Sequence, residues 1–435
     1  MLKAVKEKLR SRMGKDVVWT FAIQLTIMVC SFVINKLLAN RLSIDDFGQY
    51  NVIKRSVQVL SFVMLAGVGI ALPRYIPLYR NSTPPRTIVP LLSASMIYII
   101  GVSLVVFLIG LLFSDHIQPL IIGGATDESG GMLLLALVYA FALAMAQVVY
   151  AYFRGMGDFK WYNGTQLSIQ LAIILPLVFL PVLTVYGVFQ SWLAITALLV
   201  ALFMIIKWKE ESGKWKLPHA PHSSLHTPHF RESFREIVTY SSGRLVADFF
   251  QFSLAAFPLV YISNVCGLES TAWFSVGITF VTMITPLYSF MGIILLPYVS
   301  KAIARHEMAA ANRLIHRLLL LYMASALFFI AILCLFTEFL TTLLFASDYV
   351  VATQLTRIMV LAILPQAVYM LYRNTIDAVS VIPYNAIILG ICIVAMVAGF
   401  MLSSTLTQFA WAYLAVSNLQ GILSLITWQA VKKKA

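Results

Sequence analysis

Long apolar segments alternate with short polar segments along the whole chain. Each apolar segment is bounded by charged or turn-forming residues. A helix of about 20 residues crosses the hydrocarbon core of a bilayer, so this pattern predicts membrane-spanning helices. We predict twelve of them, at residues 17–39, 48–71, 89–113, 131–152, 164–185, 187–207, 237–262, 271–296, 315–337, 350–371, 382–403 and 407–430.

The composition agrees with this pattern and excludes a water-soluble enzyme. Hydrophobic residues make up 60% of the 435 positions, charged residues make up 11%, and the mean hydropathy is +0.87. Soluble domains average about 45–50% apolar and about 25% charged residues. The expected fold class is therefore an all-α, polytopic membrane protein.

The basic residues are distributed unevenly between the two sides of the predicted membrane. Of the 31 lysines and arginines, 25 lie in the two termini and in alternate connecting segments, whereas the other connections contain only Arg41. An excess of this kind is typical of cytoplasmic segments and does not indicate a nucleic-acid-binding face. We therefore predict a plasma (inner) membrane protein with cytoplasmic N- and C-termini.

The longest polar connection divides the predicted helices into two sets of six. We expect an N-terminal lobe at 1–207, a cytoplasmic linker at 208–236 and a C-terminal lobe at 237–435.

The two halves carry the same sequence pattern. The pattern Q-x-V-Y-x-x-x-R-x-x-x-D runs from Gln147 to Asp158 and again from Gln366 to Asp377, 219 residues later. This recurrence indicates duplication of a six-helix unit. Duplicated lobes with the same orientation predict a pseudo-symmetric pair around a central cavity that holds the substrate.

Polar residues inside the predicted helices are candidates for lining this cavity, because their exposure to lipid is costly. In the first two helices of each half, such residues recur at intervals that place them on one helical face. We predict that these faces line the cavity or couple transport to an ion. The residues assigned to these roles are Gln24, Gln58, Asp248 and Gln251.

The charges embedded in the predicted helices are five cations and one anion, Asp248. A cavity with this balance suits an anionic substrate such as phosphate or pyrophosphate, and it does not suit a cationic drug. The fifth cation, Lys36, is expected to extend to the lipid headgroups. The predicted substrate-binding residues are Lys54, Arg55, Arg244 and Arg357.

Some of these charges can be accounted for without a substrate. Arg244 and Asp248 lie four residues apart and can simply neutralise each other. Arg154 and Arg373 follow helices on the predicted cytoplasmic side, where the usual basic excess accounts for them. The alternative role for this pair is a cytoplasmic gate or substrate entry.

No catalytic residue, metal site or cofactor is predicted. The chain has no glycine-rich phosphate loop and no H-E-x-x-H sequence. The four cysteines lie in or beside apolar segments, so we expect neither a disulfide framework nor a zinc site.

Short motifs at helix ends resemble those of a known family, the polysaccharide repeat-unit flippases of the O-antigen type. This family belongs to the multidrug/oligosaccharidyl-lipid/polysaccharide exporter (MOP) superfamily. The motifs are Phe47-Gly48-x-Tyr50, Leu72-Pro73-Arg74-Tyr75 and the segment from Tyr152 to Lys160.

The resemblance implies two six-helix lobes that give alternating access to a central cationic cavity. The implied substrate is an undecaprenyl-pyrophosphate-linked oligosaccharide, moved from the inner to the outer leaflet for surface polysaccharide synthesis. Membrane lipids and other polysaccharide-assembly proteins are the further partners. Drug exporters of the superfamily use a carboxylate in the first helix for cation coupling. Here that helix carries Gln24, Asp248 is the deep acid that could replace the carboxylate, and H⁺ or Na⁺ is the candidate coupling ion.

Two alternatives belong to other functional classes. A cation-coupled multidrug antiporter of the same superfamily is disfavoured by the excess of embedded cations. A membrane glycan polymerase or ligase generally carries a large extracytoplasmic loop, and the longest predicted outside loop, 114–130, is short.

Overall fold

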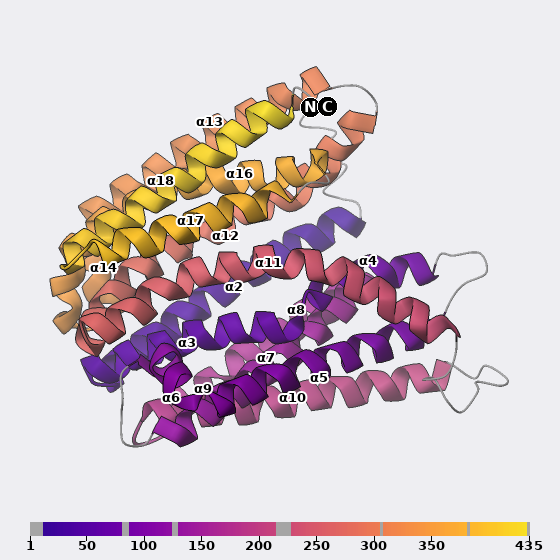
Figure 1. The fold of residues 1–435 in the computed structure, drawn as a ribbon, viewed down its shortest axis with the longest axis horizontal. Helices are drawn as coiled ribbons and strands as arrows, with labels where there is room; N and C mark the ends of the chain where they lie inside the picture. The colour runs from indigo at the N-terminus through magenta and orange to yellow at the C-terminus, as the bar shows by residue number, and fades with distance from the viewer. Residues whose placement is uncertain are drawn as a thin grey trace. The chain divides into compact units, whose positions relative to one another are not determined.

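The computed structural model describes residues 12–80, 87–123, 129–214, 228–304, 308–380 and 383–432. Most of these residues are helical and none lies in a strand, which confirms the predicted all-α fold class (Figure 1). Ten segments among them are long and apolar enough to cross a membrane, so the chain is a multi-pass membrane protein. The predicted total of twelve membrane-spanning helices stays a prediction.

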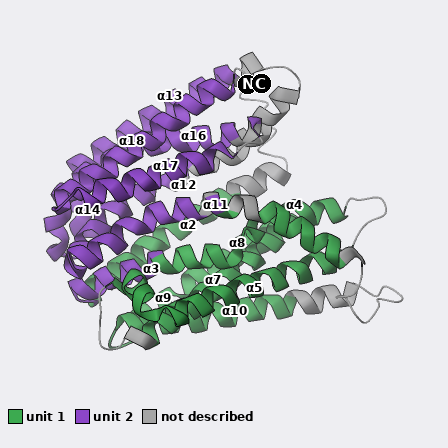
Figure 2. Ribbon diagram, in the orientation of Figure 1, with its two compact units in different colours: residues 1–41, 56–245 green, residues 42–55, 246–435 purple. Residues whose placement is uncertain are grey.

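The chain folds into two compact units, each built from two stretches of sequence (Figure 2). Unit 1 comprises residues 1–41 and 56–245, and unit 2 comprises residues 42–55 and 246–435. These boundaries differ from those of the predicted lobes, because the second predicted helix and the helix after the linker each contribute to both units.

Unit 1 is arranged around α7, against which α4, α5, α8 and α10 pack. The helix α2 packs against α8 and α9. Unit 1 contains α2 (Arg12–Arg41), the last part of α3 (Ile44–Leu65), α4 (Val68–Arg80), α5 (Val89–Leu112), α6 (Ser114–Gln118), the π-helix η1 (Pro119–Gly123), α7 (Ser129–Met156), α8 (Phe159–Ala172), α9 (Ile174–Phe179), α10 (Val185–Lys214) and the first part of α11 (Pro228–Val265).

Unit 2 is arranged around α16, against which α12, α13, α17 and α18 pack. Figure 1 shows α13, α17 and α18 running alongside α16. Unit 2 contains the first part of α3, the last part of α11, α12 (Leu268–Ala304), α13 (Met308–Leu335), α14 (Thr337–Leu344), the 3₁₀-helix η3 (Ser347–Ala352), α15 (Thr353–Met359), the 3₁₀-helix η4 (Val360–Ala362), α16 (Ile363–Val379), α17 (Tyr384–Met401) and α18 (Leu406–Val431).

Prolines account for two interruptions in helices that the sequence predicts as continuous. Pro176 has no N–H to donate to the carbonyl of Ala172, and α8 ends at Ala172. Pro365 leaves the carbonyl of Leu361 without its helical donor in the same way, and the chain forms the tighter helix η4 at that point. The predicted helices at 164–185 and 350–371 are therefore each divided.

The second predicted helix is broken at Ala66 and Gly67 and does not end at residue 71. These two residues have φ values of +51° and +77°, and the chain then continues as α4 to Arg80. A Cβ atom on Gly67 would lie 2.7 Å from the carbonyl oxygen of Ser241 on α11. The break therefore requires glycine both for its backbone conformation and for the close approach of α11.

The first part of α11 is held against α4 by polar and aromatic contacts within unit 1. The hydroxyl of Tyr79 is hydrogen-bonded to Oγ of Ser233 at 2.9 Å and donates to a carboxylate oxygen of Glu236 at 2.8 Å. The guanidinium of Arg74 lies 4.5 Å from the ring centre of Tyr240. These contacts explain why α11 belongs to unit 1 as far as residue 245.

Arg41, the exception to the charge asymmetry, has a structural role in unit 1. Its Nη1 donates to the carbonyl of Leu177 at 2.6 Å, and its Nη2 donates to the carbonyls of Leu180 and Pro181 at 2.5 and 3.1 Å. Carbonyls at the end of a helix have no partner within the helix, so Arg41 supplies donors to the end of α9.

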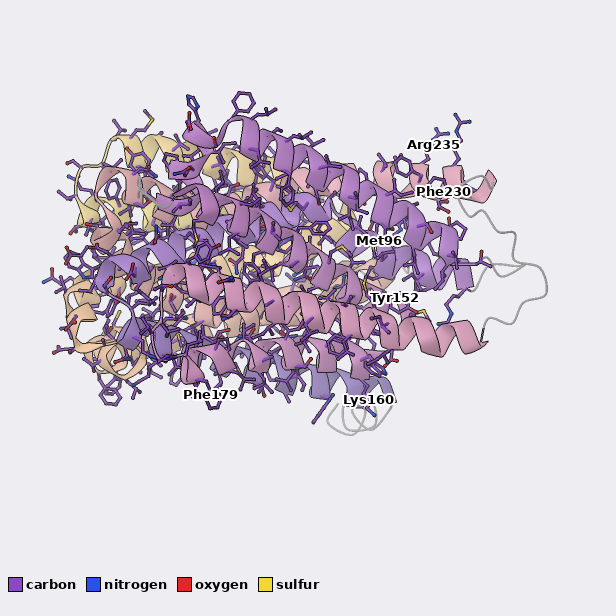
Figure 3. All side chains as sticks on the ribbon, turned by 90° about the horizontal axis from the view of Figure 1, so that it is seen from below. Met96, Tyr152, Lys160, Phe179, Phe230 and Arg235 are labelled. Atoms are coloured by element: carbon purple, nitrogen blue, oxygen red, sulfur yellow. The ribbon has the colours of Figure 1, made fainter. Side chains whose placement is uncertain are left out.

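The labelled residues of unit 1 indicate the two ends of its helices. Lys160 and Arg235, both in predicted cytoplasmic segments, lie toward one end, and Phe179 of α9 lies toward the other (Figure 3). The end that contains α9 is also the end that Arg41 contacts.

Candidate functional site

The first part of α3 carries two adjacent cations, Lys54 and Arg55, in unit 2. Tyr50 lies one turn earlier and is fully buried, and Nζ of Lys54 lies 5.3 Å from the centre of its ring. Phe47 anchors this end of the helix by packing edge-on against Tyr349, with ring centres 5.3 Å apart. The aromatic contacts of α3 thus fix the segment that carries the two cations.

The α18 helix brings a second phenol to these cations. The half-buried guanidinium of Arg55 lies near the phenols of Tyr50 and Tyr413. Nε2 of Gln366 on α16 donates to the hydroxyl of Tyr413 at 3.1 Å. Oε1 of the same side chain accepts from Oγ1 of Thr285 on α12 at 3.5 Å. We call these residues the α3–α18 cluster: Tyr50, Lys54, Arg55, Thr285, Gln366 and Tyr413.

A second polar pair extends along the same face of α16. Tyr369 lies three residues after Gln366, is buried, and donates to Oε1 of Gln251 on α11 at 3.2 Å. Gln251, which the sequence assigns to the cavity, is therefore packed against α16 close to the α3–α18 cluster.

The α3–α18 cluster has the chemistry of an anion-binding site. The ammonium group of Lys54 and the guanidinium of Arg55 offer only N–H donors, and phenols can add O–H donors. Two neighbouring positive charges repel each other, and an anion bound between them relieves that repulsion. The cluster therefore suits a compact group with more than one negative charge, such as a phosphate or diphosphate.

Some residues of this site were not among the predicted binding residues. Gln366 and Tyr369 belong to the repeated Q-x-V-Y pattern, which by itself indicates duplication and not a binding role. That pattern is the signal that could have identified them. Tyr413 carries no signal of its own, because its role depends on how α18 packs against α16.

In unit 1, Gln24 lies on a polar seam between α2 and α8. Three side-chain hydrogen bonds join the two helices, at intervals that keep all the donors and acceptors on facing sides. They run from Nδ2 of Asn163 to Oγ1 of Thr20 (2.8 Å), from Nε2 of Gln24 to Oε1 of Gln166 (2.9 Å) and from Nε2 of Gln170 to Oγ of Ser31 (3.3 Å). The assignment of Gln24 to the cavity or to coupling stays a prediction.

The two arginines proposed as a gate lie in different units. Arg154 is exposed in unit 1, and its Nη2 donates to the carbonyl of Gly69 at 2.8 Å, next to the break before α4. Arg373 is half-buried in unit 2, and its carbonyl accepts a hydrogen bond from Nδ2 of Asn385 at 3.0 Å. Their gating role stays a prediction.

The remaining predicted site residues are Arg357, Gln58, Arg244 and Asp248, of which Gln58 lies one turn after Lys54 and Arg55 on α3. Arg357 is exposed on α15, and its carbonyl accepts a hydrogen bond from Sγ of Cys334 on α13 at 4.0 Å. Gln58 is half-buried on the part of α3 that belongs to unit 1. The side chains of Arg244 and Asp248 lie outside the described residues, although both positions belong to α11.

Comparison of the chain with known protein families and solved structures identifies its family and its fold. Residues 13–303 match the family described as polysaccharide biosynthesis proteins. A search of curated protein sequences gives no match.

Several solved structures are similar to this chain. The lipid II flippase MurJ, in an inward closed conformation, has a TM-score of 0.66 at 14% identity, over 96% of this chain and 87% of that one. An outward-facing multidrug resistance MATE family transporter of the MOP superfamily has a TM-score of 0.61 at 12% identity, and the match covers 99% of this chain and 98% of that one. A MOP superfamily transporter from Pyrococcus furiosus has a TM-score of 0.59 at 11% identity, and the match covers 96% of this chain and 93% of that one. The chain therefore has the fold of MOP-superfamily transporters.

Proposed function

Because the chain belongs to the polysaccharide biosynthesis protein family, we propose that it is a flippase for lipid-linked oligosaccharides. It moves undecaprenyl-pyrophosphate-linked repeat units from the inner to the outer leaflet of the plasma (inner) membrane. The repeat units serve a surface polysaccharide of the O-antigen type. The MOP-transporter fold supports a transporter rather than a membrane glycan polymerase or ligase.

The observation that carries this proposal is the pair of cations in the α3–α18 cluster. Lys54 and Arg55 are adjacent, half-buried and flanked by phenols at a depth where a charged group is costly. The diphosphate of the lipid carrier is compact and carries more than one negative charge. In our proposal the cluster holds this diphosphate while the polyprenyl chain stays in the bilayer.

The charge of the substrate supplies a driving force for export. A negative cell interior favours outward movement of an anion by about 2.3 kcal/mol per charge per 100 mV. Transport of a diphosphate can therefore proceed without an ion gradient. H⁺ or Na⁺ remains the candidate for any coupling, with Asp248 and Gln24 as the residues to examine.

Complementation of a bacterial strain that lacks its repeat-unit flippase tests this function. We expect the wild-type chain to restore surface polysaccharide and the double variant Lys54→Ala/Arg55→Ala to abolish it, because the diphosphate then loses both cations. The matched control is Lys160→Ala/Arg231→Ala, which removes two exposed cations outside the cluster and should keep the polysaccharide. Immunoblots of membranes would check that all variants accumulate equally.

Two results would contradict the proposal. If the Lys54→Ala/Arg55→Ala variant restored polysaccharide as well as the wild type, the cluster would not be the binding site. If the wild-type chain instead exported cationic dyes from vesicles in exchange for H⁺ or Na⁺, the multidrug antiporter alternative would replace it.

A further inference from the structure

In the part of the chain that the structure describes, the phenol of Tyr413 has one side-chain hydrogen bond. Its phenol oxygen accepts the N–H of Gln366 at 3.1 Å, so its own proton points elsewhere. Among the described residues, no acceptor for that proton lies within hydrogen-bonding distance. Arg55, beside the phenol, has only N–H groups and cannot accept it.

The phenol is also held rigidly in place. The Tyr413 side chain is 7% exposed, and its ring packs edge-on against Phe274 with centres 6.4 Å apart. At the other end of the Gln366 side chain, Oε1 lies 3.5 Å from Oγ1 of Thr285, a hydroxyl that also donates to the carbonyl of Val281 at 3.2 Å. A donor fixed in this way binds an acceptor without first having to be ordered.

We propose that the hydroxyl of Tyr413 donates a hydrogen bond to a phosphate oxygen of the substrate, beside the guanidinium of Arg55. Tyr413 is then a substrate-binding residue, and Gln366 is the residue that positions it. This inference rests on the proposed function and identifies the recognised group as the diphosphate rather than the sugars or the polyprenyl chain. A phenol and a guanidinium supply donors from two different helices, α18 and α3, to the oxygens of one group.

Equilibrium binding to the full-length protein in lipid nanodiscs tests this role. The probes are undecaprenyl diphosphate and, as the lipid-free form of the same chemistry, inorganic pyrophosphate. We expect Tyr413→Phe to raise the Kd of both probes about tenfold or more, by the same factor, because the lost bond is to a charged phosphate. The ring stays in place, but Nε2 of Gln366 loses its acceptor, so the melting temperature without ligand should fall slightly and is compared with that of Gln366→Leu.

Two further variants separate binding from packing. Tyr349→Phe is the matched control, because it removes another buried phenol hydroxyl of unit 2 that has no hydrogen-bond partner among the described residues. It should leave both Kd values unchanged. Gln366→Leu should weaken binding when Tyr413 is present and add nothing in the Tyr413→Phe background, since it acts only through the phenol.

The outcomes distinguish this inference from the proposed function. If the wild type failed to bind undecaprenyl diphosphate, the proposed function itself would be wrong. If the wild type bound it and Tyr413→Phe bound it equally well, only the role of Tyr413 would be overturned. A variant weakened toward the lipid but not toward pyrophosphate would also overturn that role, because the contact would then not be to phosphate.

Discussion

Arg41 donates hydrogen bonds to the carbonyls of Leu177, Leu180 and Pro181 at the end of α9. Its planar group reaches several acceptors at once, which the single ammonium of a lysine cannot do in the same geometry. Arg41 lies outside the predicted cytoplasmic segments, and its hydrogen bonds to these carbonyls explain why a basic residue is found there.

Arg41→Ala should therefore destabilise the protein without removing a substrate contact. Loss of hydrogen bonds to a charged group costs about 1.5–3 kcal/mol, so we expect the Tm to fall by at least about 2 °C. The measurement is thermal unfolding of purified protein followed by tryptophan fluorescence. Arg231→Ala, which removes an exposed cation elsewhere, is the control, and equal Tm values for the two variants would contradict this role.

At the residue scale, charged residues within apolar segments are easier to single out from the sequence than neutral ones. Lys54 and Arg55 were identifiable because charges within apolar segments are rare and costly. Gln24 was also identifiable as part of a polar stripe, but a stripe that faces a cavity and one that faces a neighbouring helix have the same spacing. Its hydrogen bond to Gln166 comes from the packing of α2 on α8, which no single helix specifies.

Gly48 allows two helices of unit 2 to approach closely at the start of α3. A Cβ atom at this position would lie 2.0 Å from the carbonyl oxygen of Leu268, where α12 begins. The contact is to backbone, which cannot move aside as a flexible side chain can. This close approach gives a physical reason for the glycine in the Phe47-Gly48-x-Tyr50 motif.

Replacing this glycine tests the close approach of the helices. Gly48→Ala should lower the free energy of unfolding by about 1–3 kcal/mol or more through overpacking. Gly101→Ala, in α5, is the matched control, because a Cβ atom there meets nothing within 4 Å. Alanine is the better helix former, so the control should be neutral or stabilising by up to about 1 kcal/mol. Equal Tm values for the two variants would show that α3 and α12 do not need the glycine.

At the element scale, hydropathy predicts where the helices lie, and glycine and proline decide where they break. The interruption before Pro176 follows from a missing N–H, which the sequence displays directly. The break at Ala66 and Gly67 cannot be read from the sequence in this way, because it depends on the position of Ser241 in a helix far along the chain.

At the scale of the whole molecule, the charge asymmetry predicts which side of the membrane each connection faces. Lys160 follows α7 in a predicted cytoplasmic segment, and Asp348 lies in η3 on the predicted outer side. Both side chains are exposed, so each can report its side without disturbing the core.

Labelling of whole cells with a membrane-impermeant maleimide would test this orientation. The background replaces the two half-buried cysteines, Cys266 and Cys334, with alanine, since the other two are buried. We expect Asp348→Cys to react in intact cells and Lys160→Cys to react only after the cells are lysed. The opposite pattern would invert the predicted topology.

Each unit combines two separate stretches of sequence, and this sets the order in which its parts are made during synthesis. Unit 1 lacks the partners of Tyr79 until Ser233 and Glu236 have been translated. Residues 42–55 of unit 2 are made early and must wait for the rest of that unit, including Tyr349, which packs on Phe47. At about 5–20 residues per second, that interval of some 300 residues lasts roughly 15–60 s. Throughout it, the nascent chain holds Lys54 and Arg55 in the membrane without α18, so the step most exposed to misfolding continues after unit 1 has been completed at residue 245.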